Sequence, residues 1–230
     1  NLTSLDLSSF NTKGVEYVDN IFKNCSNLTT IYASENFAFG SGLKKGADMF
    51  LGCDKLKGFI EYNKNTDTDK NNSKFANYKT GYFTKLVGKN GDEKIGAAGV
   101  ILAAENLTLN DEKDFVAYEP FTATAATYNR SMKIGTTWGT LCLPFAIDQS
   151  KETECKFYSL TGIDNDNDCI TLESYEEGAK IPAGTPVLFK MNEGVQELEI
   201  SAQNAELVKE PVAGTNTDVN LVGSFTKIGG

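Results

Sequence analysis

Acidic residues alternate along one short segment of the chain, at Asp164, Asp166 and Asp168. Loops that hold Ca²⁺ have such a pattern, because a hard cation binds several oxygen atoms at short range. The remainder of a calcium loop is missing here, since the sixth position is Cys169 instead of glycine and the twelfth is Tyr175 instead of an acid. We therefore expect a turn without a resident metal, and Asp164, Asp166 and Asp168 remain the calcium candidate of this chain.

Few residues could act as a catalytic base or nucleophile. Histidine, the commonest general base and metal ligand, does not occur in the sequence. Cys142 would need a cationic base beside it, and only a lysine could serve, so we expect a core residue there. Carboxylates are numerous, but the sequence singles out no pair that could do glycosidase work. These observations predict a protein that is not an enzyme and uses no cofactor.

Aromatic side chains offer a different chemistry, because their faces can stack on the apolar faces of sugars. Trp138, the only tryptophan, could form such a platform with Tyr128, Tyr158 and Tyr175. The position of Trp138 just before an apolar segment favours packing instead.

The five cysteines cannot all pair within one chain. Cys25 and Cys53 occupy equivalent positions in two similar segments, which is typical of small buried residues, and we expect both to be unpaired thiols. Cys142, Cys155 and Cys169 lie in strand-like segments, and the sequence does not decide whether two of them meet.

Charge is distributed unevenly along the 230 residues. Residues 1–90 hold 12 lysines and 9 acids, a net charge of +3, whereas residues 91–230 carry a net charge of −12. This asymmetry indicates two domains, and the acidic half would repel phosphate backbones, which argues against nucleic acid. No apolar run approaches the roughly 20 residues that cross a bilayer, so we expect no transmembrane segment in this chain. The chain begins inside a repeat, and we expect an upstream part of the protein.

The elements that must position these groups begin with an internal repeat. Six mostly apolar residues recur 28 positions later: Val15, Ile21, Phe22, Cys25, Leu28 and Ile31 correspond to Leu43, Met49, Phe50, Cys53, Leu56 and Phe59. A fixed offset of this kind indicates a solenoid, in which each unit buries its apolar face by stacking on its neighbour. Leu2, Leu28 and Leu56 open successive units, so we expect them above one another in a common interior.

Each unit should combine a strand with a short helix. Val15, Val18, Phe22 and Cys25 follow one another at steps of three, four and three, the spacing of a helical stripe. On the strands, alternation turns the intervening residues toward solvent. The candidate binding residues on this exposed face are Ser4, Asp6, Thr30, Tyr32, Ile60 and Tyr62. Residues 63–74 carry no apolar side chain and should form an exposed loop.

After residue 95 the pattern changes to short apolar alternations separated by turn residues. So many strands at nearly regular spacing predict an antiparallel β-sandwich over residues 95–230. With a leucine-rich repeat segment and its closing piece over residues 1–88, the expected fold class is α+β.

The repeat segments carry a resemblance to a known family. They are Asn1-Leu-Thr-Ser-Leu-Asp-Leu-Ser-Ser-Phe-Asn-Thr12, Ile21-Phe-Lys-Asn-Cys-Ser-Asn-Leu28 and Met49-Phe-Leu-Gly-Cys-Asp-Lys-Leu56. These resemble the BspA-like leucine-rich repeats of surface proteins from Bacteroides-type bacteria. In the second half, Trp138-Gly-Thr-Leu-Cys-Leu-Pro-Phe145 and Ile181-Pro-Ala-Gly-Thr-Pro-Val-Leu188 are similar to signatures of a β-sandwich domain common in the same proteins.

The resemblance implies an exported bacterial protein at the cell surface or outside the cell. Its function would be adhesion or protein binding through the repeats, with a host or bacterial surface protein as partner. The alternative is a carbohydrate-binding β-sandwich module of a protein that handles surface glycans. Neither function involves nucleic acid.

Overall fold

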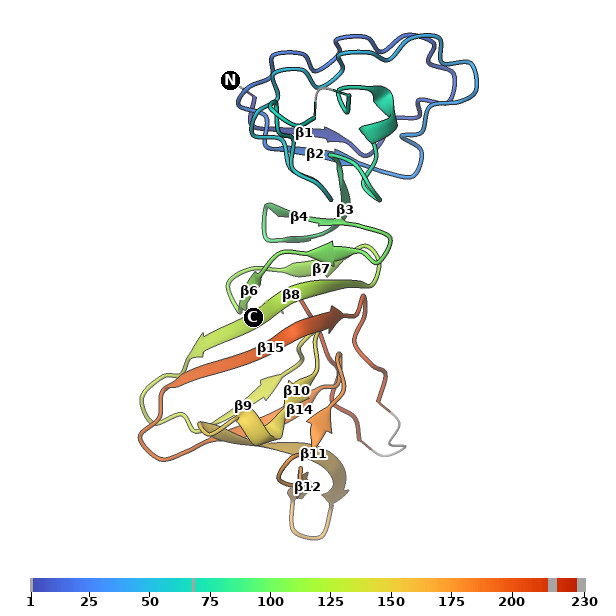
Figure 1. Cartoon of the computed structure of the whole chain (residues 1–230). Coiled ribbons are helices and arrows are strands. Elements are labelled where there is room, and N and C mark those ends of the chain that lie inside the picture. The colour runs from blue at the N-terminus through green and yellow to red at the C-terminus, as the bar shows by residue number, and fades with distance from the viewer. Residues whose placement is uncertain (1, 68, 215–218, 227–230) are drawn as a thin grey trace. The chain divides into compact units, whose positions relative to one another are not determined.

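The structure is a computed structural model that describes residues 2–67, 69–214 and 219–226 (Figure 1). The chain divides into two units. The first comprises Asn1–Val87 and Ile95–Ala104, and the second comprises Gly88–Lys94 and Glu105–Gly230. Within the described ranges, no helix has the length and apolar character needed to cross a bilayer.

In the first unit the repeats stack through parallel strands. β1 (Ser4–Leu7) pairs with β2 (Thr30–Ala33), and Leu5 lies opposite Ile31. The third position is taken by β3 (Thr84–Asn90), whose Thr84 lies opposite Tyr32. β3 is followed by β4 (Glu93–Ala98), which pairs in antiparallel fashion with β5 (Ala103–Ala104). The fold is therefore solenoid-like and mostly β, and it is compatible with a repeat protein.

The predicted helix between the repeat strands is wrong, and with it the α+β fold class. The fold is nearly all β and solenoid-like, and the described residues contain only two three-residue 3-10 helices, η1 (Ser73–Phe75) and η2 (Gln149–Lys151). The backbone N–H groups of Val18, Asn20, Phe22 and Asn24 donate across to the carbonyls of Lys45, Ala47, Met49 and Leu51 at 3.0, 3.2, 3.1 and 2.7 Å. Amides used between coils in this way cannot form the i to i−4 bonds of a helix.

Left-handed residues explain why this segment turns where a helix was expected. Asn20 and Asn24 have φ values of 60° and 63°, and their equivalents 28 positions later, Asp48 and Gly52, have φ values of 51° and 81°. A left-handed residue in every turn breaks a right-handed helix, and Asn, Asp and Gly adopt this conformation most readily. The apolar residues spaced three and four positions apart therefore belong to successive turns, and each turn brings one of these side chains inward.

The interior of the first unit contains most of the repeated apolar residues, whereas Ile21 is 53% exposed. Leu28 and Leu56 are fully buried, and the rings of Phe22 and Phe50 stack with centroids 5.8 Å apart. Leu2 does not join them, because it precedes β1 and is 53% exposed. Leu28 and Leu56 are each turned inward by a bond from their own N–H to the carbonyl of the cysteine three residues before.

The third repeat leaves the solenoid early. Its Lys57 N–H still donates to the Thr29 carbonyl at 3.0 Å, 28 positions back. The chain then reverses at Gly58, whose N–H donates to the Ile60 carbonyl at 3.0 Å. A Cβ at Gly58 would collide with the backbone of Tyr82 and Phe83, so this close approach requires glycine. As a result Phe59, expected to be buried, is 55% exposed.

The second unit contains two larger groups of strands. In the first, β8 (Phe121–Ser131) pairs in antiparallel fashion with β15 (Glu197–Leu207) and in parallel fashion with β6 (Leu107–Asn110). In the same group, β7 (Phe115–Ala117) pairs with the Gly88–Asn90 end of β3. The second is antiparallel, in the order β12 (Cys169–Ser174), β11 (Cys155–Asp164), β14 (Val187–Met191) and β9 (Trp138–Leu141). A further short pair joins β10 (Ile147–Asp148) to β13 (Lys180–Ile181).

Candidate functional site

The parallel strands bring four of the six predicted binding residues together. Ser4 lies opposite Thr30, and Asp6 lies opposite Tyr32, so the four form two adjacent rows on one strand face. Ser4 is exposed and the other three are half-buried. The Asp6 carboxylate accepts bonds from the Ser8 N–H at 2.9 Å and from the Ser8 hydroxyl at 2.6 Å, which hold it at the end of β1. We call these four residues the repeat face.

The other two predicted residues do not belong to the repeat face. Tyr62 is 6% exposed, and its hydroxyl donates to Asn71 Oδ1 at 2.9 Å inside the unit. Ile60 is half-buried and packs against the apolar core. Both were expected in a third exposed strand, but the reversal at Gly58 prevents that strand from forming. The prediction of an exposed Tyr62 is therefore wrong.

Two residues that the sequence reasoning missed extend the repeat face. Thr84 of β3 lies beside Tyr32, where the third repeat strand was expected. A Cβ built on Gly96 of β4 would come within 3.0 Å of the Tyr32 ring, which shows that the ring lies over this glycine. The usable signal in the sequence was a polar residue, Thr84, directly after the aromatic pair Tyr82 and Phe83, both of which are fully buried.

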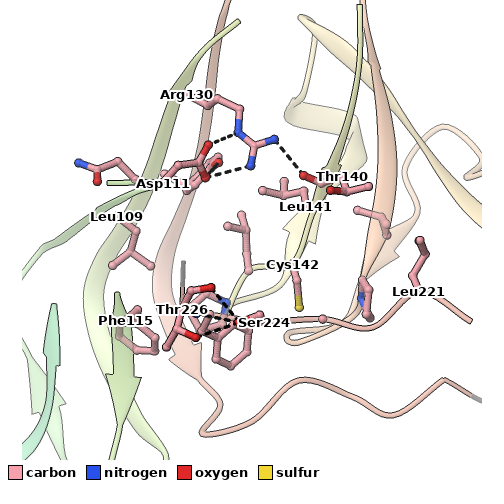
Figure 2. A pocket seen from close by; sticks show the side chains of 18 of the residues that line it. Leu109, Asp111, Phe115, Arg130, Thr140, Leu141, Cys142, Leu221, Ser224 and Thr226 are labelled. Atoms are coloured by element: carbon pink, nitrogen blue, oxygen red, sulfur yellow. Dashed lines mark hydrogen bonds and ion pairs between the residues drawn. The ribbon is translucent and has the colours of Figure 1, made fainter. Parts of the chain in front are cut away.

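The second unit contains a pocket of about 390 Å³, shown in Figure 2. One end carries Arg130 and Asp111, and the walls are mainly apolar, with Leu109, Phe115 and Leu141 among them. The pocket thus combines an apolar interior with one charged pair.

Arg130 and Asp111 are hydrogen-bonded to each other and to neighbouring residues of the protein. Arg130, the only arginine of the chain, donates to both oxygens of Asp111 at 2.5 and 2.9 Å and to the Thr140 carbonyl at 2.9 Å. The Tyr128 hydroxyl donates to the same carboxylate at 2.6 Å. Burial alone would raise the pKa of Asp111, but the bonds from Arg130 and Tyr128 lower it. This arrangement ties β8 to β9 and to the turn after β6, so its role is structural.

Cys142 lines the same pocket, and within the described ranges no basic side chain is hydrogen-bonded to its thiol. Burial raises the pKa of its thiol to about 11, and the Sγ atom lies 3.3 Å from the Gly184 carbonyl. A thiol with such a pKa is a poor nucleophile at neutral pH. All five cysteines are free thiols, and Cys53, which is fully buried, donates from Sγ to the Phe22 carbonyl at 2.9 Å.

The calcium candidate is organised as a turn between β11 and β12. Asp164 accepts bonds from the N–H groups of Asp166 and Asn167 at 3.1 and 3.2 Å and from the Asn167 amide at 2.8 Å. Asp168 adopts a left-handed φ of 50°. Among the described residues there is no group of three or more acidic, cysteine or histidine side chains placed to hold a metal ion.

The aromatic candidates separate into different places. Trp138 and Tyr158 lie together, with ring centroids 5.1 Å apart, whereas Tyr128 belongs to the pocket and Tyr175 follows β12. Packing was favoured for Trp138 from the sequence, yet this side chain is 41% exposed. Its exposure arises because β9 turns Trp138 away from the interior, while Leu141 of the same strand is buried.

One carboxyl group of the second unit has an unusual proton affinity. Burial, reinforced by the carboxylates of Glu154, Asp148 and Glu199, raises the pKa of Glu152 to about 7. A carboxyl whose pKa is higher in the folded state favours folding at low pH, and this contribution is lost as the pH rises from about 4.5 through about 7. Glu152 does not line this pocket, and its raised pKa makes the stability of the fold depend on pH.

This shift leads to a test by denaturation at different pH values. Glu152→Gln should make the protein more stable than the wild type at pH 8, by on the order of 2 kcal/mol, because the ionised carboxylate is removed. The difference should shrink toward pH 5. Urea unfolding at pH 5, 6, 7 and 8 measures it, with the exposed Glu177→Gln as a control. An equal difference at every pH would contradict the assignment.

A comparison of the chain with family models, with curated proteins and with solved structures found no match.

Proposed function

We propose that this chain is a noncatalytic binding protein that recognises a protein partner through the repeat face, Ser4, Asp6, Thr30 and Tyr32. The observation that supports this most directly is the register of β1 and β2, which sets these side chains in adjacent rows. β2 is bonded to β1 on one side and to β3 on the other, so its side chains project from a backbone that is held on both edges.

The chemistry of the repeat face suits contact with another protein. Tyrosine provides a large ring and a polar hydroxyl at a low entropic cost, and it is enriched at the energetic centres of protein interfaces. Asp6 lies directly opposite Tyr32 and adds a charge, while Ser4 and Thr30 supply hydroxyl groups. A Tyr ring beside a carboxylate would bind a partner surface with basic and apolar side chains.

The finer identity that we propose is supported by the same repeats. The stacked, mostly-β coils are compatible with a repeat protein, and the repeat segments resemble BspA-like leucine-rich repeats. We therefore propose an exported adhesion protein of the bacterial surface, with a host or bacterial surface protein as its partner.

The test is binding of the purified chain to an array of purified extracellular-matrix and bacterial-surface proteins. For any protein that the wild type captures, Tyr32→Ala combined with Asp6→Asn should weaken capture by about tenfold or more, because a central aromatic residue and a charge are removed. Asp6→Asn keeps an oxygen that can accept the Ser8 N–H, so the end of β1 stays intact.

The matched control changes the same residue types away from the repeat face. Tyr17 is exposed at a short parallel bridge to Lys45, and Asp54 is exposed after the second repeat, so Tyr17→Ala with Asp54→Asn should leave capture unchanged. Equal capture by the two double variants would refute the repeat face as the binding surface.

A further inference from the structure

A second exposed surface lies on the antiparallel sheet of the second unit. Trp138 of β9 is directly opposite Lys190 of β14, and Lys190 is directly opposite Lys156 of β11. Residues that face each other across antiparallel strands project to the same side of the sheet. Tyr158, two positions after Lys156, projects to that side as well. We call Trp138, Tyr158, Lys156 and Lys190 the aromatic–lysine surface.

This surface points away from the interior. The alternate residues of the same strands, Phe157 and Phe189, are fully buried and contact each other at 6.5 Å between ring centroids. Trp138 remains 41% exposed, and both lysines are exposed. The aromatic pair is therefore available to a ligand.

The two rings form an angled platform. Their planes are inclined at 48° and their centroids are 5.1 Å apart, and the Lys190 Nζ lies 5.4 Å from the centre of the Trp138 ring. Trp138 and Tyr158 come from strands on either side of β14, so their rings meet over the side chains of that strand. An apolar ring surface thus lies beside a positive charge.

The two positive charges of this surface lie on directly paired residues. Lys156 and Lys190 face each other directly, and like charges in that position repel. Neither lysine forms an ion pair with any residue in the described part of the chain, although the sequence has a net charge of −9. A bound anion would relieve this repulsion.

We propose that the aromatic–lysine surface binds negatively charged carbohydrate, namely polysaccharides that carry carboxylate or sulfate groups. The apolar C–H face of a sugar ring stacks on Trp138 and Tyr158, and the acidic group of the same or the next sugar contacts the ammonium groups of Lys156 and Lys190. An acidic peptide would satisfy the lysines but would not require the stacking platform. This site is in the second unit and is independent of the repeat face.

The experiment uses the whole chain and two matched pairs of polymers. Polygalacturonate and its methyl ester differ in the carboxylate, and dextran sulfate and dextran differ in the sulfate. Affinity electrophoresis or calorimetry should show binding of at least one charged polymer and of neither neutral one, and the charged pair that binds identifies the acidic group. Binding should weaken with added salt, because the contact includes exposed charges.

Variants separate stacking from general charge attraction. Trp138→Ala should weaken binding by about tenfold or more, Trp138→Phe should retain part of it, and Lys190→Glu should abolish it. Tyr118→Ala removes an exposed aromatic residue elsewhere in the same unit, and Lys89→Glu makes the same charge change on β3. Both controls should bind as the wild type does.

Three results would overturn the proposal. The first is an absence of binding to both charged polymers. The second is Trp138→Ala binding that equals the wild type, which would show simple charge attraction. The third is wild-type binding of polyglutamate that matches the sugar polymer and is insensitive to Trp138→Ala, which would assign the surface to acidic peptides.

Discussion

Replacing Phe83 with alanine is expected to destabilise the repeat unit by about 3–5 kcal/mol. Phe83 is fully buried, and its ring meets those of Phe22, Phe37 and Phe50 at centroid distances of 6.1, 5.2 and 5.9 Å. All three contacts are edge-to-face, a favoured geometry for aromatic pairs. A cavity at this position would remove these three ring contacts, which join the residue before β3 to the core of the preceding repeats.

Chemical denaturation of the whole chain, followed by circular dichroism, measures the loss. Hydrogen exchange with mass spectrometry then locates it, and faster exchange is expected at the amides of Val18, Phe22 and Asn24, which bond to the next coil. Phe83→Leu should cost less, about 1–1.5 kcal/mol, because most of the volume is kept. Phe59→Ala provides the matched control, since Phe59 is more than half exposed. A Phe83→Ala protein as stable as Phe59→Ala would contradict the closing role.

Replacing Asp67 with alanine is expected to destabilise the same unit by about 2–4 kcal/mol. Asp67 is 4% exposed and accepts four hydrogen bonds, from the Asn63 N–H at 2.9 Å, from Lys70 Nζ at 2.9 Å, from the Tyr82 hydroxyl at 3.4 Å and from the Thr66 hydroxyl at 3.5 Å. Without the carboxylate, the buried Tyr82 hydroxyl loses an acceptor, and so does the backbone N–H of Asn63. Asp67→Asn should have a smaller effect, because an oxygen remains.

The effect of Asp67 should also depend on pH. The hydrogen bond from Lys70, with that from the Asn63 N–H, lowers the pKa of Asp67 despite its burial. A carboxyl with a lowered pKa stabilises the fold above its unfolded value of 3.8, and this contribution is lost as the pH falls below it. Urea unfolding should therefore show a larger gap between wild type and Asp67→Asn at pH 7 than at pH 3. Asp69→Asn, at an exposed neighbour, should show no such change, and a gap of equal size at both pH values would argue against an ionised Asp67.

The buried position of Asp67 contradicts the expectation that all of residues 63–74 form an exposed loop. Residues 63–74 have no apolar side chain, so they were expected to be exposed. In the structure Asp67 and Asn71 turn inward to meet the hydroxyls of Tyr82 and Tyr62. Polar residues can be buried when their partners are buried too, and those partners were not visible in the local composition.

The helix prediction failed for a related reason. Steps of three and four apolar residues are produced both by a helix and by a chain of tight turns that each place one residue inward. The distinction lay in Asn20, Asn24, Asp48 and Gly52, which allow left-handed turns at matching positions. Their backbone amides bond between coils, and such bonds exist only when two coils are already stacked.

The sequence by itself determined the repeat offset, the inward positions of Phe22, Leu28, Phe50 and Leu56, and the outward direction of Ser4, Asp6, Thr30 and Tyr32, because alternation and periodicity are local properties of the chain. Only the tertiary structure decided that Thr84 replaces a third repeat strand, that Tyr62 is buried, and that Trp138, Tyr158, Lys156 and Lys190 share one surface. Those outcomes depend on pairing between strands that are distant along the chain, and strand pairing is set by packing and backbone hydrogen bonds that no single segment contains.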